Sequence, residues 1–92
     1  MTITVYFTAH LKAAAGSARQ TLALKPGGTL ADCFSLVCDR ATDTLRNLII
    51  DERGELRPSI ILCVNDEQTS LADPTPLSED SEITFLAAIS GG

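Results

Sequence analysis

Tryptophan is absent from this sequence, and aromatic residues of any kind are few. One tyrosine and three phenylalanines among 92 residues give an aromatic share of 4%. The core must therefore be built mostly from leucine, isoleucine, valine and alanine. Hydrophobic residues make up 45% of the chain and charged residues 21%, which is typical of a globular protein and excludes a disordered one. The length suits a single domain with one core.

Clusters of basic residues and long apolar runs are also absent. Twelve acidic residues outweigh seven lysines and arginines, giving a formal net charge of −5. Because nucleic-acid binding needs clustered cations to contact phosphates, we expect no nucleic-acid partner. No stretch approaches the length of a membrane-spanning helix, and the first residues lack the pattern of a signal peptide. We therefore expect a cytoplasmic protein that does not act at a membrane.

The sequence offers little to a metal or a cofactor. Its three cysteines, Cys33, Cys38 and Cys63, are odd in number and form no CxxC pair, so neither a disulfide framework nor a zinc site is predicted. The Gly27-Gly28 pair lacks the lysine and hydroxyl residue of a phosphate-binding loop. We expect the chain to bind no metal and no cofactor, and not to be an enzyme by itself.

Two alternating segments open the chain. Residues 2–8 place Ile3, Val5 and Phe7 on one face and polar residues on the other, which indicates a half-buried strand. Residues 20–24 form a second such run, and residues 10–18 between them are expected to be a loop. The two runs together predict a hairpin with a long connection.

The next segment has the features of an amphipathic helix. Thr29 is a suitable N-cap, and Asp32 stands where the acidic member of a capping box is expected. A shorter helix, capped by Asp43 or Thr44, is predicted to follow. The apolar positions repeat at helical spacing and form one stripe. They are Leu30, Cys33, Phe34, Val37, Cys38 and Ala41.

The second half of the chain adds two strands. Residues 59–64 are apolar on both faces, which predicts a central strand, and residues 82–86 alternate as a last strand. Prolines make the segment between them irregular. The order strand, strand, helix, strand, strand predicts an α+β domain over residues 1–86. One main helix would lie across a mixed sheet of four to five strands, beside a short second helix.

The chain closes with the tail 87–92, Ala-Ala-Ile-Ser-Gly-Gly. Two residues without Cβ atoms give a thin, flexible end that carries an α-carboxylate and can enter a narrow channel. We expect Gly92 to be the reactive residue, with Gly91, Ser90 and Ile89 threading the channel before it. The alternative is an ordinary disordered chain end.

Four segments carry a resemblance to a known family. They are residues 5–16 (VYFTAHLKAAAG), 51–58 (DERGELRP), 64–67 (VNDE) and 82–92 (EITFLAAISGG). Together with the order of elements, they resemble the MoaD/ThiS family of ubiquitin-like sulfur carriers, and the resemblance spans essentially the whole chain. Ala87 departs from the family pattern, since members often carry proline there. The resemblance implies a β-grasp (ubiquitin-like) fold.

The resemblance also implies a function. An E1-like adenylating enzyme would activate the Gly92 carboxylate with ATP, and a sulfurtransferase or other sulfur donor would convert it to a thiocarboxylate. An acceptor enzyme would then take the sulfur. That acceptor would be the large subunit of molybdopterin synthase, a cysteine synthase-like enzyme or a thiazole synthase-like enzyme. The chain is then a carrier and not a catalyst.

Three alternatives remain open. The chain could be the small subunit of molybdopterin synthase in a stable complex. It could be a ubiquitin-like modifier that forms isopeptide bonds through Gly92, or an interaction module without tail chemistry.

The strand pattern also predicts a docking surface. With Ile60, Leu62 and Val64 facing the helix, the other side chains of that strand reach the opposite face of the sheet. Apolar residues exposed there often mark a partner surface, and the resemblance implies docking of the activating and acceptor enzymes on the same face. The predicted docking residues are Tyr6, Ile61, Cys63 and Leu86.

Overall fold

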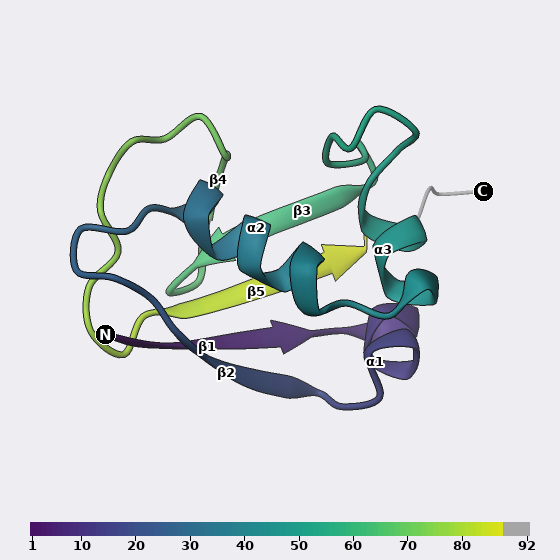
Figure 1. Ribbon diagram of the computed structural model, residues 1–92, viewed down its shortest axis with the longest axis horizontal. Helices are drawn as coiled ribbons and strands as arrows, with labels where there is room; N and C mark the ends of the chain where they lie inside the picture. Colours follow the sequence, from purple (N-terminus) through teal and green to yellow (C-terminus); the bar gives the residue numbers. More distant parts are fainter. Residues whose placement is uncertain (88–92) are drawn as a thin grey trace.

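The computed structural model describes residues 1–87 as a mixed sheet with helices on one side and at one end (Figure 1). Along the chain the elements are β1 (Thr2–Phe7), α1 (Ala9–Ala15), β2 (Arg19–Ala23), α2 (Leu30–Arg40), α3 (Asp43–Ile49), β3 (Ile60–Val64), β4 (Glu67–Thr69) and β5 (Glu82–Ala87). The strand order across the sheet is β2-β1-β5-β3-β4. β1 and β5 run parallel, and the other neighbours are antiparallel. The predicted α+β architecture is confirmed.

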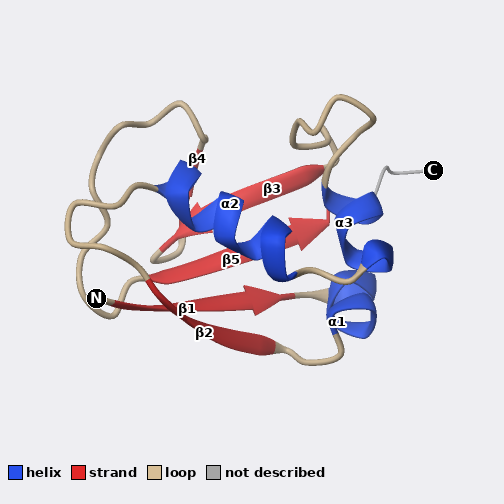
Figure 2. Cartoon of the chain, in the orientation of Figure 1, coloured by secondary structure: helices blue, strands red, loops and turns tan. Residues whose placement is uncertain are grey.

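The core lies between the sheet and α2, which crosses one face of it (Figure 2). Phe85, on the middle strand, has its ring centroid 5.4 Å from that of Phe7 and 6.3 Å from that of Phe34 on α2. Nearly all other core residues are aliphatic, as the scarcity of aromatic residues predicts. They include Ile3, Val5, Leu11, Leu22, Leu30, Val37, Leu45, Ile49, Leu62 and Ile83.

The helix α2 begins as predicted. The Thr29 Oγ1 accepts a hydrogen bond from the Asp32 N–H, while the Asp32 carboxylate accepts one from the Thr29 N–H, so both halves of the capping box are present. The first four residues of the apolar stripe are buried, whereas Cys38 is half-buried. The buried residues are Leu30, Cys33, Phe34 and Val37.

The prediction of a loop over residues 10–18 is wrong, because α1 occupies most of it. Four alanines in Ala9–Ala15 favour helix, and Leu11 is fully buried. Gly16 is the C-cap at a φ of 81°, and its N–H donates to the Lys12 carbonyl. Its role is therefore to end a helix and not to form a loop.

Three smaller differences concern boundaries. The N-cap of α3 is Thr42 and not Asp43 or Thr44, because the Thr42 Oγ1 accepts the Leu45 N–H at 3.1 Å. β3 is an interior strand as its apolar faces predict, but the middle position belongs to β5. β5 extends one residue beyond the predicted end, to Ala87, which pairs with Ile60.

Candidate functional site

The four residues predicted for docking lie on the face of the sheet opposite to α2. Ile61 is opposite Leu86 in the β3–β5 register, and Thr84 is opposite both Cys63 on β3 and Tyr6 on β1. All five are half-buried. We call this set the outer sheet face. Its geometry agrees with the predicted strand phase, and its role in docking stays a prediction.

Polar contacts fix one part of the outer sheet face. The Tyr6 hydroxyl donates to Glu82 Oε2 at 2.9 Å. This hydrogen bond to Glu82 is the main cause that raises the pKa of Tyr6 above its usual value, so the phenol stays protonated and donates at neutral pH. The Glu82 N–H in turn donates to Asn65 Oδ1. Arg19 is opposite Tyr6 on β2.

The sequence did not reveal the Tyr6–Glu82 contact. The two residues are 76 positions apart and meet because β1 and β5 are parallel neighbours. Alternation within each strand predicts which face a side chain occupies, but it carries no information on which strands pair.

β5 leads to the tail at the end of the sheet where α1 and α3 pack. The Phe85 carbonyl accepts hydrogen bonds from Thr8 Oγ1 at 3.2 Å and from the Thr8 N–H at 3.4 Å. α1 contacts β5, β1 and α3. The tail positions predicted to react or to thread a channel lie outside the described residues. They are Ile89, Ser90, Gly91 and Gly92.

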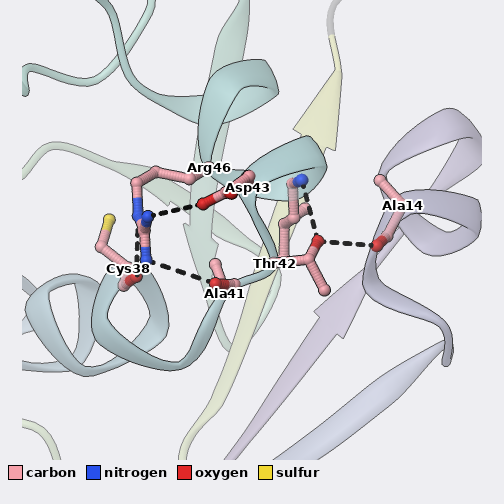
Figure 3. A network of polar contacts seen from close by, with 7 residues as sticks. Ala14, Cys38, Ala41, Thr42, Asp43 and Arg46 are labelled. Carbon is pink, nitrogen blue, oxygen red and sulfur yellow. Dashed lines mark hydrogen bonds and ion pairs between the residues drawn. The ribbon is translucent and has the colours of Figure 1, made fainter.

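Hydrogen bonds join the three helices near this end (Figure 3). The Thr42 Oγ1 donates to the Ala14 carbonyl at 3.2 Å, which links the start of α3 to α1. Arg46 donates through Nε and Nη2 to the Cys38 carbonyl and through Nη2 to the Ala41 carbonyl, which caps the end of α2. The position where β5 ends is therefore held by packed helices.

The cysteines take the places that the helical stripe predicts. Cys33 is buried, and burial raises the pKa of its thiol to about 12. Burial also raises the pKa of the half-buried Cys38 thiol. Both remain protonated thiols at neutral pH and contribute packing. Within residues 1–87, no group of three or more histidine, cysteine or acidic side chains is arranged to hold a metal ion.

His10 lies exposed on α1. Its side chain makes no hydrogen bond and no ion pair with residues 1–87. No helix between residues 1 and 87 has the length and apolar character needed to cross a bilayer.

Comparison with known proteins adds structural relatives. No family model matches this sequence, and no curated protein sequence matches it. Among solved structures, SAMP1 from Haloferax volcanii superposes with a TM-score of 0.88 at 21% identity and complete coverage of both chains. Urm1 from Trypanosoma brucei gives 0.74 at 25% identity, with 99% of this chain and 95% of that chain covered.

A third relative is a chain of the complex between subunits 1 and 2 of molybdopterin-converting factor from Helicobacter pylori. Its TM-score is 0.66 at 17% identity, again over the full length of both chains. The chain has the β-grasp, ubiquitin-like fold. The resemblance of this β-grasp chain to the MoaD/ThiS proteins therefore holds in three dimensions, because its structural neighbours are SAMP1, Urm1 and a molybdopterin-converting factor protein.

Proposed function

We propose that this β-grasp chain is a sulfur carrier whose functional end is the α-carboxylate of Gly92. The observation that carries the proposal is the place of β5 in a fold shared with molybdopterin-converting factor. The middle strand ends at Ala87, five positions before Gly92. Five extended residues reach about 17 Å at roughly 3.3 Å each, which is enough for the tail to enter the active site of a partner.

The chemistry of this proposal assigns activation to partners. A carboxylate is a poor electrophile, so an E1-like enzyme would transfer AMP from ATP to Gly92, with pyrophosphate leaving. The outer sulfur of a donor persulfide, such as that of a sulfurtransferase, would then form a bond to the carbonyl carbon as AMP leaves. A second thiol would reduce the resulting acyl disulfide, which releases the thiocarboxylate and leaves a disulfide on the donor side. The resulting thiocarboxylate is a soft nucleophile, suited to an acceptor enzyme. The carrier would contribute the tail and the surface that presents it.

The outer sheet face is the proposed docking surface. Ile61, Leu86 and Cys63 give it an apolar centre, and Tyr6 with Glu82 gives it a polar border. An apolar centre with a polar rim is the usual composition of a protein–protein interface. Because Leu86 is one residue before the end of β5, a partner bound here would lie next to the tail.

Mass spectrometry of the protein isolated without a C-terminal tag tests the proposal. We expect Gly92 to be the last residue and to carry, in part of the population, sulfur in place of one oxygen. Because this change in mass is close to that of one oxidised cysteine, a thiol-reactive label must be localised to the Gly92 fragment by tandem spectra. A carboxylate that stays unlabelled after incubation with ATP, an activating enzyme and a sulfur donor would contradict the proposal.

Gly92→Ala should keep the fold but lower adenylation, because a Cβ at this position hinders both threading and attack on ATP. Pyrophosphate exchange with the activating enzyme measures the first step. Ser35→Ala, on the exposed side of α2, is the matched control and should leave the exchange unchanged. Equal exchange rates for Gly92→Ala and the control would count against a reactive Gly92.

A second candidate is the small subunit of molybdopterin synthase in a stable complex. It is favoured by the H. pylori neighbour, which is a chain of the complex between subunits 1 and 2. Size-exclusion chromatography of the protein from its own cells distinguishes this candidate. A large subunit that elutes with the chain at constant ratio supports it, and an isolated chain supports the free carrier.

A third candidate is a protein modifier. It is favoured by the structural likeness to SAMP1, whose full name is small archaeal modifier protein 1. Activation of Gly92 would be the same, but a lysine amine of a target would displace AMP and form an isopeptide bond. Conjugates of higher mass that carry a Gly-Gly remnant on lysine would support this candidate. The chain itself offers only Lys12 and Lys25, both exposed.

A further inference from the structure

A pocket of about 470 Å³ lies where three segments of the chain meet. They are the start of α2, the hairpin of β3 and β4, and the long loop 70–81 between β4 and β5. Figure 1 shows this loop passing the start of α2 at the end of the sheet away from α1 and α3. The volume is within the range of pockets that hold ligands in other proteins.

The hairpin brings Glu67 to this pocket. Val64 pairs with Glu67, so the turn consists of Asn65 and Asp66, both at positive φ (48° and 72°), which is the conformation of a type I′ turn. Residues directly opposite each other share a face, so Glu67 lies with Val64 on the α2 side of the sheet. The Asn65 Oδ1 accepts the Glu82 N–H at 2.9 Å, which fixes the hairpin to β5.

Hydrogen bonds hold loop 70–81 against the other two segments. The Asp73 carboxylate accepts the Thr75 N–H at 2.9 Å and the Thr69 hydroxyl at 3.2 Å. The hydrogen bonds from Thr75 and Thr69 lower the pKa of the Asp73 carboxyl, so it is ionised at neutral pH. The Leu77 N–H donates to the Gly28 carbonyl at 2.8 Å, just before α2 begins. The pocket is therefore formed without a ligand.

The lining combines apolar side chains with carboxylates, and we call it the acidic pocket. Leu30 and Leu77 are 2% and 8% exposed, and Val64 is half-buried. Glu67 and Asp73 are exposed and bring negative charge. Among residues 1–87, no lysine, arginine or histidine lines this pocket. The lining therefore suits a cation that has an apolar stem.

The charge around the acidic pocket is also of one sign. No lysine, arginine or histidine follows Arg57 in the sequence, whereas six acidic residues do. All six are exposed, and each either lines the pocket or is next in sequence to a residue that does. They are Asp66, Glu67, Asp73, Glu79, Asp80 and Glu82.

None of these six carboxylates is neutralised by a cation of the described chain. The one ion pair within residues 1–87 is Arg46–Asp43. Glu79 and Glu82 accept hydrogen bonds from uncharged donors, a backbone N–H and a phenol. The positive end of the α2 dipole is close to the pocket, but the Asp32 carboxylate caps it. The surface potential here is therefore negative and attracts cations.

We propose that the acidic pocket binds an arginine side chain from a basic segment of a partner protein. The aliphatic part of the arginine would pack against Leu30 and Leu77, and its guanidinium would donate to Glu67 and Asp73. Arginine fits better than lysine because its planar group presents several N–H donors to two carboxylates at once.

The extent of the negative surface favours a protein over a small amine. The carboxylates outside the pocket can meet further cations of the same segment, whereas the same charge repels nucleic acids and anionic membranes. The pocket lies at the start of β5, next to Ser81, and the tail follows the other end of this strand, at Ala87. The proposal therefore does not depend on the sulfur chemistry.

The probe is the blocked peptide acetyl-Gly-Arg-Gly-Arg-Gly-amide, titrated to millimolar concentration into the isotope-labelled protein at low salt. We expect saturable shifts of the Glu67, Asp73 and Thr75 amides in two-dimensional NMR spectra. The matched control peptide carries citrulline, which has the shape of arginine without its charge, and should cause no shifts. Equal shifts with both peptides, shifts confined to Ile61 and Leu86, or no shifts at all overturn the proposal.

Two neighbouring carboxylates separate the pocket from the general charge of the surface. Glu67→Gln removes a charge that lines the pocket and should weaken binding of the arginine peptide about fivefold. Asp66→Asn removes the same charge one residue away, outside the pocket, and asparagine adopts its positive φ readily. It should change the affinity less than about twofold. Melting temperatures confirm that both variants fold, and an equal loss of affinity overturns the proposal.

Two further titrations identify the class of ligand. The same peptide with lysine in place of both arginines should bind about threefold more weakly, and equal affinity would overturn the assignment to arginine. Calcium chloride at micromolar concentration should leave the Glu67 and Asp73 amides unshifted. Shifts of these amides by calcium at that concentration would make the pocket a metal site and overturn the proposal.

Discussion

Ile60 and Ile61 are adjacent residues of the same type in different environments. Ile60 is 6% exposed and belongs to the core under α2, whereas Ile61 is half-buried on the outer sheet face. The alternation of a strand makes this difference, since successive side chains point to opposite faces. Substitutions at these two adjacent positions therefore test the stability of the fold and the binding of a partner separately.

We expect Ile61→Asp to weaken binding of an activating or acceptor enzyme while lowering the free energy of unfolding by about 1 kcal/mol or less. Ile60→Asp should lower that free energy by more than about 3 kcal/mol, because it places an unpaired carboxylate in the core. Urea denaturation gives both values, and titration with the partner gives the affinity.

The comparison is decisive because both variants introduce the same charge. If Ile61→Asp unfolds as readily as Ile60→Asp, Ile61 is a core residue and the outer sheet face is assigned wrongly. If Ile61→Asp binds the partner as tightly as the parent does, docking takes place elsewhere.

Among the elements, α2 was the most predictable and α1 the least. The cap at Thr29 and the stripe from Leu30 are local signals, and local signals are read reliably from sequence. In α1 the alanines favour helix, but one buried position, Leu11, gives no periodic pattern, so the sequence around Gly16 predicts a loop. The strand faces of Ile61 and Cys63 followed from alternation.

The parts that sequence reasoning missed depend on contacts between distant segments. Tyr6 meets Glu82 only because β1 and β5 are neighbours, and β4 is too short to show a pattern. Leu24, which follows β2, and Leu36 on α2 line the same groove, although they are far apart in the sequence. No local rule predicts such a meeting of residues.

The corner where α2 ends and α3 begins gives a prediction about the packing of these two helices. Arg46→Ala should lower the free energy of unfolding by about 2 kcal/mol, because the Cys38 and Ala41 carbonyls lose their charged donor. Asp43→Ala removes only the exposed ion pair to Arg46 and should cost about 0.5 kcal/mol. Thermal and urea denaturation check both values.

An equal loss for the two variants would mean that the ion pair, and not the cap on α2, stabilises the corner. Arg46→Lys is a useful third variant, since it keeps the charge but cannot reproduce the planar fork of donors. We expect its loss in the free energy of unfolding to lie between the losses of Arg46→Ala and Asp43→Ala.

For the whole molecule, the order of the strands in space matters more than their order in the chain. β5 pairs with β1 on one side and β3 on the other, so it joins the pair β1–β2 to the pair β3–β4. Its residues Ile83 and Phe85 are fully buried. The sheet is therefore two separate strand pairs until β5 is in place.

A chain truncated after Ala87 should fold, with a melting temperature within a few degrees of the parent, because every described strand is retained. A chain truncated after Ser81 lacks the middle strand and should show neither a cooperative thermal transition nor dispersed amide resonances. Circular dichroism and NMR spectra measure these outcomes. A cooperative transition in the shorter chain would show that the two strand pairs associate without β5.

The parallel pairing of β1 with β5 also has a consequence for biosynthesis. A ribosome makes β1 early and β5 late, and the two must meet before the sheet closes. While the first 81 residues emerge, the nascent polypeptide can form the two strand pairs but lacks the strand that joins them. Its apolar side chains therefore remain accessible to chaperones and proteases. Folding is then delayed until β5, residues 82–87, has been translated. Incomplete translation products of this gene would be degraded, and would not compete with the finished protein for its partners.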